Sequence, residues 1–382
     1  MLNKVPNCSP VALELSRRAV AGIELQRAFC SSRIQGLDSI RALAVLMVLL
    51  GHAAEDRPEI PVPVAPLSGL GVKIFFVLSG FLITRLLQDE LDIRGRVDFA
   101  QFYRRRIARL MPVFYLYLVI SISVLLIRGR PIPWDAVGSA IFYFTNYYQA
   151  FTGAKTNIVA HCWSLAVEEQ FYMLWPLLIS ALWVRRKNIA FTLVVVILCV
   201  WCWRLYLVLY SATSIDYLYR ALDTRADELA VGCLIAVLMR SDVWCSRFAC
   251  VANIKLSAPI LIIFLYTSTL IGSKSEVYRY CFGFMIEPIV IGLFLLLTLI
   301  ACVRDSLSAN LIKNRLIVYI GKISYCMYLF HGLIMYSTQR LVESRTESFW
   351  IGLLVSFIAV ILFSAASFRW FETPMRTWIG GK

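Results

Sequence analysis

The stretch that decides the fold is Gly36–His52, GLDSIRALAVLMVLLGH, an apolar run long enough for a membrane helix that nevertheless carries Arg41 and His52. Ionisable side chains are costly inside a bilayer, so they are usually functional there and need a partner or a water-filled cavity. Histidine is also the side chain best suited to move a proton near neutral pH, and the chain contains only three. We therefore predict that both residues serve a site within the membrane.

The composition predicts a polytopic membrane protein. Of the 382 residues, 59% are hydrophobic and 16% are charged, and the mean hydropathy is +0.71. Apolar segments lie near 38–54, 70–89, 111–127, 163–184, 189–210, 226–240, 255–272, 284–303, 318–340 and 349–370. We expect an all-α bundle of about ten transmembrane helices. We expect its domain to cover 36–374, between a cytoplasmic leader, 1–35, and a cytoplasmic tail, 375–382, with no room for a second soluble domain in these 382 residues.

A weaker segment, Trp134–Phe151, is rich in aromatic residues and is predicted to be re-entrant or interfacial. Positive-inside counting places the arginines of 94–109 in the cytoplasm. If 134–151 does not cross, the basic clusters at 185–187 and 304–315 and at the carboxy terminus also lie inside. Both termini are then cytoplasmic, which favours the re-entrant interpretation.

The net charge of +14 does not indicate nucleic acid, because the basic residues form short clusters between apolar runs. The eleven cysteines are scattered and predict no disulfide framework. Cys199 and Cys202 form a C-x-x-C within an apolar run that has no nearby histidine. We expect neither a redox pair nor a metal site.

His52 suits a general base that removes the proton from an attacking hydroxyl, although a histidine at a helix end can also simply bind water or a headgroup. Such a base needs a carboxylate to orient its ring. The candidates are Asp38, Glu55, Asp56, Glu168 and Glu169. Adjacent carboxylates on a helix point about 100° apart, and of the last two we favour Glu168. His52, the two glutamates and His331 are expected to converge in the outer half, with Arg41 about 16 Å from His52 along its helix.

Several other polar stretches have two interpretations each. Arg104, Arg105, Arg106 and Arg109 either anchor the chain on anionic lipid or hold a phosphorylated ligand. Lys73 and Arg85 are expected to snorkel. Asp223 and Arg225 start a helix or form a pocket wall, and we expect them to pair. The run from Ser324 to His331 places a histidine on the serine's helical face, as a packed residue or a substrate contact.

These motifs, in order, resemble the acyltransferase 3 family. They are Arg41-x10-His52, FFVLSGFLIT at 75–84, YRRRIARLMP at 103–112, WSLAVEEQFY at 163–172, SYCMYLFH at 324–331 and FETP at 371–374. The resemblance covers nearly everything after residue 35.

The resemblance implies a membrane O-acyltransferase that moves an acetyl group from acetyl-CoA to a carbohydrate hydroxyl. Suitable acceptors are lipopolysaccharide O-antigen, exopolysaccharide and lipo-oligosaccharide. By position, Arg41, His52 and Glu168 match the catalytic residues and the four arginines of 104–109 match the donor-binding motif. Further pocket candidates are Asp38, Trp163, Ser164, Glu169, Tyr172, Asp223, Arg225, Ser324, Tyr328 and His331.

We expect the first, second and tenth apolar segments to wall the donor path, in a bacterial inner membrane. No bound cofactor is expected, and the partners are acetyl-CoA, the acceptor glycan and lipid. A hydrolase-like domain is not recognised in the sequence, which favours the stand-alone type over the two-domain peptidoglycan type. A transporter or flippase would bury the same residues along a substrate path, but the two similar halves of such proteins are not found. A membrane partner without activity is the third alternative.

Overall fold

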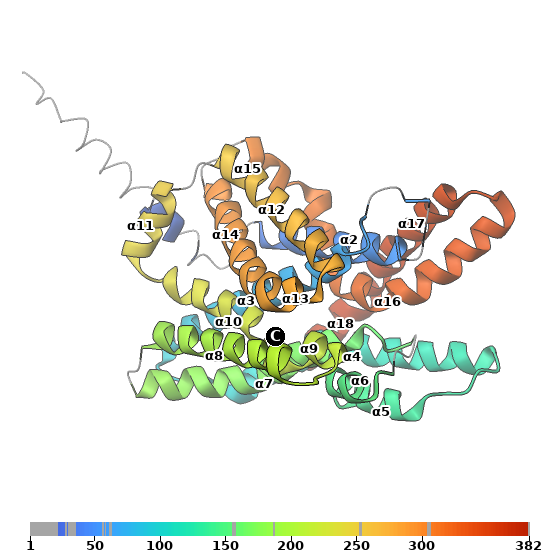
Figure 1. Cartoon of the computed structure of the whole chain (residues 1–382), viewed down its shortest axis with the longest axis horizontal. Coiled ribbons are helices and arrows are strands. Elements are labelled where there is room, and N and C mark those ends of the chain that lie inside the picture. The colour runs from blue at the N-terminus through green and yellow to red at the C-terminus, as the bar shows by residue number, and fades with distance from the viewer. Residues whose placement is uncertain are drawn as a thin grey trace, which may run out of the picture.

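The computed structural model describes residues 22–26, 29, 36–55, 57, 59–60, 63–154, 158–185, 188–251, 254–303 and 307–380, and these residues contain helices and no strand. Ten long helices carry the fold (Figure 1): α2 (Leu37–Ala53), α3 (Leu67–Arg94), α4 (Phe99–Ile127), α7 (Cys162–Val184), α8 (Ile189–Tyr210), α10 (Leu222–Leu238), α12 (Ile254–Lys274), α14 (Phe284–Val303), α16 (Arg315–Thr346) and α17 (Phe349–Ser367). Each predicted apolar segment coincides with one of them. The predicted all-α membrane bundle is confirmed.

Short elements connect the long helices. They are α5 (Trp134–Ile141), α6 (Thr145–Thr152), α9 (Ile215–Arg220), α11 (Asp242–Val251), α13 (Glu276–Tyr278), α15 (Leu307–Ile312), α18 (Thr373–Gly380) and the π-helical turns η1 (Arg279–Gly283) and η2 (Phe368–Glu372).

Seven of the described helices are long and apolar enough to cross a bilayer, or eight if α9–α10 and α11, bent by 107°, form one broken span. α2 and α7 are not among them. These two helices carry Arg41, His52, Glu168 and Glu169, so part of the candidate site lies on helices outside this set of seven.

The segment predicted to be re-entrant or interfacial folds into α5 and α6, which have eight residues each. An eight-residue helix is about 12 Å long, whereas the hydrocarbon core is about 30 Å thick. Tyr143 separates the two helices with a φ of 53°. Neither helix is long enough to cross the membrane alone.

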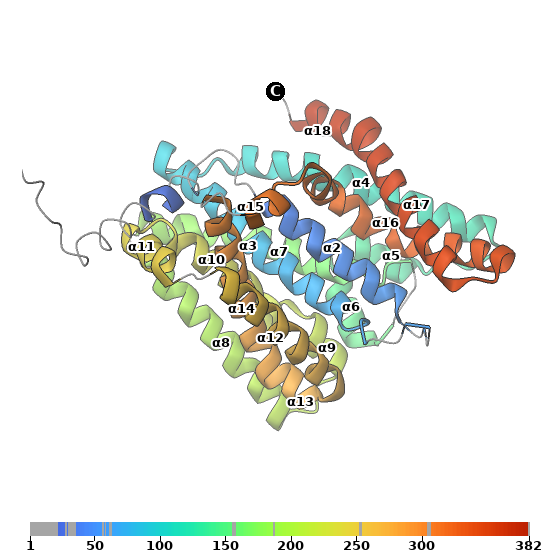
Figure 2. The ribbon, with the colours of Figure 1, turned by 90° about the horizontal axis from the view of Figure 1, so that it is seen from above.

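The two ends of the bundle carry different short helices. Figure 2 shows α11, α15 and α18 toward one end and α9 and α13 toward the other. The first end carries Arg240, Arg247 and Arg376, which positive-inside counting places in the cytoplasm. Asp56, Arg186, Lys187, Arg304, Lys382 and most of the predicted leader lie outside the described residues.

Small residues let the central helices approach closely. A Cβ on Gly80 of α3 would overlap the Leu229 carbonyl of α10, and one on Gly321 of α16 would overlap the Asp38 carbonyl of α2. Contacts of this kind drive helix association in membranes, where the hydrophobic effect between helices is absent. The second contact fixes α16 beside the Asp38–Arg41 turn of α2.

Candidate active site

A cavity of about 640 Å³ lies among α2, α3, α4, α7 and α16. The prediction that the tenth apolar segment, which forms α17, lines the donor path is wrong. α16 takes that place, and α17 packs behind α16. Nine predicted residues line the cavity: Arg41, Arg105, Arg106, Arg109, Ser164, Glu168, Tyr172, Ser324 and Tyr328. The structure therefore brings together side chains from four separate sequence motifs.

One wall of the cavity is basic. Arg105, Arg106 and Arg109 come from the first three turns of α4, which Asp98 caps by accepting a hydrogen bond from the Gln101 backbone N–H at 2.9 Å. Arg41 enters from α2 and forms an ion pair with Asp38 at 2.8 Å. This arrangement concentrates positive charge where a phosphorylated ligand would be held.

Arg104 belongs to the same motif but does not line the cavity. Its Nε donates to the carbonyl of Ile379 at 2.7 Å, which ties α4 to α18. On a helix, Arg104 points about 100° away from Arg105, so the four arginines predicted to act together divide between the cavity and a structural contact.

Glu168 faces the cavity and is already bonded there. Its Oε1 accepts hydrogen bonds from Ser79 on α3 and from Tyr172, one turn further along α7. Arg106 approaches the same oxygen to 3.9 Å, and its guanidinium lies 3.4 Å from the Tyr172 ring centre. The expectation that Glu168 orients His52 is therefore wrong for this structure, because its carboxylate serves the arginine wall.

All three histidines of the chain converge. The ring of His52, at the end of α2, lies 4.9 Å from that of His331 on α16, between centroids. His331 in turn lies 5.3 Å from His161, which precedes α7. The predicted convergence of His52 with His331 is confirmed. His161 completes a row of three imidazoles.

The hydrogen bonds of these rings identify their tautomers. Nδ1 of His52 lies 2.9 Å from the Val48 carbonyl, and Nδ1 of His331 lies 2.6 Å from the Tyr328 carbonyl. A carbonyl oxygen only accepts, so Nδ1 is the donor in each bond, and in the neutral form of each ring the lone pair lies on Nε2. Burial, followed by the nearby His52, lowers the pKa of His161 to about 4, which keeps it neutral at pH 7.

Tyr328 and Ser164 stand between the histidine row and the cavity. Both line the cavity, and their hydroxyl groups are hydrogen-bonded to each other. The Tyr328 hydroxyl also donates to the His161 carbonyl at 3.1 Å. The Tyr328 ring lies 5.7 Å from the His161 ring. The basic cavity and the three imidazoles thus meet at this hydroxyl pair.

Some site residues were missed at the sequence level. His161 lies two residues before the WSLAVEEQFY motif and was not among the candidates, although a histidine so close to the two glutamates was an available signal. Ser79 lies within FFVLSGFLIT, where a lone serine in an apolar run gave little indication that it would donate to Glu168. Phe75, Phe76 and Tyr325 also line the cavity.

The remaining candidates lie elsewhere. Glu169 does not line the cavity. Asp223 accepts hydrogen bonds from Tyr147 at 3.2 Å, Trp203 at 2.8 Å and Tyr217 at 3.0 Å.

The predicted pairing of Asp223 with Arg225 is wrong, since residues two apart on a helix face different sides. Arg225 instead contacts Glu228 at 3.1 Å. Its guanidinium also lies 5.4 Å from the ring centre of Trp163, a candidate that is buried behind the cavity.

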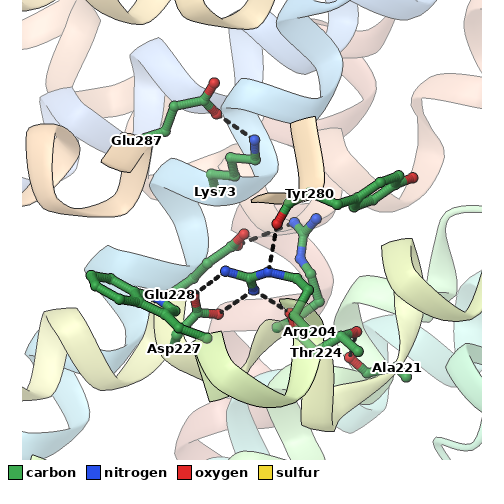
Figure 3. Close-up of polar contacts among 10 residues, drawn as sticks. Lys73, Arg204, Ala221, Thr224, Asp227, Glu228, Tyr280 and Glu287 are labelled. Atoms are coloured by element: carbon green, nitrogen blue, oxygen red, sulfur yellow. Dashed lines mark hydrogen bonds and ion pairs between the residues drawn. The ribbon is translucent and has the colours of Figure 1, made fainter. Parts of the chain in front are cut away.

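A buried ionic cluster backs the cavity wall (Figure 3). Arg204 on α8 binds both carboxylate oxygens of Asp227 on α10, at 3.1 and 2.9 Å. Lys73 on α3 is bonded to Glu287 on α14, so the prediction that Lys73 snorkels is wrong. Lys73 is 5% exposed, and a lysine this deep needs a carboxylate partner.

Comparison with known proteins identifies relatives. A family model described as an acyltransferase domain matches residues 34–369. The peptidoglycan O-acetyltransferase OatA of Listeria monocytogenes is 29% identical over 362 residues, which cover 90% of this chain and 56% of the relative. The O-acetyltransferase OatA of Staphylococcus aureus is 30% identical over 373 residues, covering 92% and 58%.

The putative peptidoglycan O-acetyltransferase YrhL of Bacillus subtilis is 28% identical over 365 residues, covering 90% of this chain and 55% of the relative. The chain thus spans a little over half the length of these relatives. No solved structure gives a significant match.

Proposed function

The chain belongs to the acyltransferase 3 family, and we propose that it is a membrane enzyme that transfers an acetyl group from cytoplasmic acetyl-CoA to a carbohydrate hydroxyl on the outer side. The observation that carries this proposal is the meeting of a basic cavity with a histidine row at Tyr328 and Ser164. The basic cavity suits a phosphorylated thioester, and the histidine row suits proton removal from a hydroxyl.

The donor occupies the cavity. Arg105, Arg106 and Arg109 contact its phosphates, since guanidinium groups bind phosphate oxygens in bidentate fashion. The pantetheine arm then extends past Phe75 and the other apolar residues of α3 toward Ser164 and Tyr328. The thioester carbonyl is thereby delivered to the end of the cavity nearest the histidines.

Arg41 serves the donor in this proposal. It lines the cavity and is neutralised in part by Asp38. Arg41 and His52 are about 16 Å apart along α2, so one reacting centre does not contact both. We assign Arg41 to holding the donor.

His52 is the general base. Its Nε2 takes the proton of the acceptor hydroxyl while the hydroxyl oxygen attacks the thioester carbonyl carbon. The C–S bond then breaks, and His52 returns the proton to the leaving thiolate, which yields the O-acetyl ester and free CoA. The exposed position of His52 at the end of α2 gives an acceptor access to it.

The relatives carry the acceptor proposal. Two of them are named for peptidoglycan O-acetylation, so we propose a peptidoglycan-like glycan as the first acceptor to test in a bacterial cell membrane. O-antigen, exopolysaccharide and lipo-oligosaccharide remain the other acceptors. Mass spectrometry of the surface glycans from cells with and without the gene tests this choice. The expected signal is a mass increase of about 42 Da for each acetylated unit.

A further inference from the structure

The row of three histidines includes two whose part in the reaction has not been assigned. The proposed reaction uses His52, whereas His331 and His161 have no assigned part in it. His331 is 3% exposed and its Nδ1 is fixed to the Tyr328 carbonyl. A buried imidazole held in one tautomer beside a proposed base points to a role in proton handling.

The usual orienting group of a histidine base is missing. Asp38 pairs with Arg41, and Glu168 accepts from Ser79 and Tyr172. Within the ranges that the structure describes, His52 makes its hydrogen bond to the Val48 carbonyl and to no carboxylate. Nothing among these residues therefore stabilises the imidazolium as a carboxylate would.

The groups around His52 can be named helix by helix. α16 presents His331, with the rings 4.9 Å apart and tilted by 43°. The residue before α7, His161, is the next ring in the row. α3, which also packs on α2, brings the backbone of Ser68 against Gly51. The titratable neighbour in direct ring contact with His52 is thus another imidazole.

We propose that His331 is the positioning residue of the His52 base. This inference rests on the proposed function. The contact with His331 holds the His52 ring in place, and the Nε2 lone pair of His331 stabilises the imidazolium that forms when the acceptor hydroxyl loses its proton. The proton stays within this imidazole pair until it returns from His52 to the thiolate, so no further reactant is needed. A neutral imidazole performs the task that the sequence assigned to a carboxylate.

The test uses the full-length protein in membrane vesicles, with labelled acetyl-CoA as donor and the vesicles' own glycan as acceptor. His331→Ala removes the ring, and His331→Asn keeps a donor for the Tyr328 carbonyl but lacks the second ring nitrogen. Gln339→Ala is the matched control, because Gln339 lies two turns further along α16, is also buried and bonds to Glu343 at 2.8 Å. Protein abundance in the membrane is measured for each variant.

We expect both His331 variants to lower kcat by about 30-fold or more, within the range of acid-base contributions. The KM for acetyl-CoA should stay unchanged because the arginine wall is intact. Added imidazole should restore several-fold activity to His331→Ala, where a cavity receives it, and not to His331→Asn. Gln339→Ala should differ from wild type by less than about twofold.

Two results overturn the inference. One is normal kcat in both His331 variants, and the other is a loss in His331→Ala that imidazole does not restore while the protein is present at normal abundance. Failure of the proposed function looks different, because His52→Ala would then retain transfer in the same vesicles.

Discussion

The imidazole rings of His52 and His331 lie 4.9 Å apart although they come from opposite ends of the sequence. α16 reaches α2 because Gly321 allows the two backbones to touch at Asp38. The same two helices therefore carry Arg41 and Ser324 into the cavity and His52 and His331 into the histidine row. One helix contact organises both halves of the proposed reaction path.

The arginine wall predicts a difference between neighbouring residues of α4. Arg109→Ala should raise the KM for acetyl-CoA about tenfold, since a charge-assisted contact to phosphate contributes about 1.5 to 3 kcal/mol. Arg104→Ala is the control, because Arg104 bonds to the Ile379 carbonyl outside the cavity. Initial rates at varied acetyl-CoA concentration give the KM of both variants. Equal effects of the two substitutions on the KM would contradict phosphate binding by the cavity arginines.

Glu168 gives a prediction that separates two roles. Glu168→Gln keeps an acceptor for Ser79 and Tyr172 but removes the charge opposite Arg106. We expect the acetyl-CoA KM to rise about fivefold, because Arg106 is no longer held in place. The kcat should change by less. A large fall in kcat at unchanged KM would instead indicate that Glu168 acts on the base.

The cluster of Figure 3 predicts a stability effect. Lys73→Met leaves Glu287 buried without its cationic partner, which should cost about 3 to 5 kcal/mol. The double variant Lys73→Met/Glu287→Gln should regain part of that loss, because it removes both charges. Thermal unfolding in detergent compares the stability of wild type, Lys73→Met and the double variant. A double variant less stable than Lys73→Met would contradict the pairing.

The topology can be tested with reporter fusions. Because α5 and α6 have only eight residues each, we expect the loop after α7 to lie on the cytoplasmic side. Alkaline phosphatase fused at Ser275, beyond α12, should be active, and the same enzyme fused at Lys187 should be inactive. Activity at Lys187 would mean that residues 134–151 cross the membrane.

The sequence predicts the helices well and the partners of individual side chains less well. Hydropathy locates all ten long helices because apolar length is a local property. Arg105, Arg106, Arg109, Glu168 and Tyr172 are found by motif and do line one cavity, whereas Arg104 of the same motif does not. The pairing of Lys73 with Glu287 and of Arg225 with Glu228 depends on helix packing and on helical phase, which spacing alone did not resolve.

The orientation of His52 shows the same limit. A carboxylate was the expected partner of His52, and Glu168 was favoured over its neighbour Glu169. The carboxylate of Glu168 instead accepts a hydrogen bond from Ser79, which lies on a different helix. His331 then occupies the place beside His52 because α16 crosses α2 there. No local pattern encodes that crossing.

The role of His52 is tested by following the labelled acetyl group of acetyl-CoA into glycan, in membrane vesicles that contain wild type or His52→Ala at equal abundance. We expect wild type to transfer the label and His52→Ala to transfer about 100-fold less or none, because the base is gone. Transfer by His52→Ala at the wild-type rate would contradict this role.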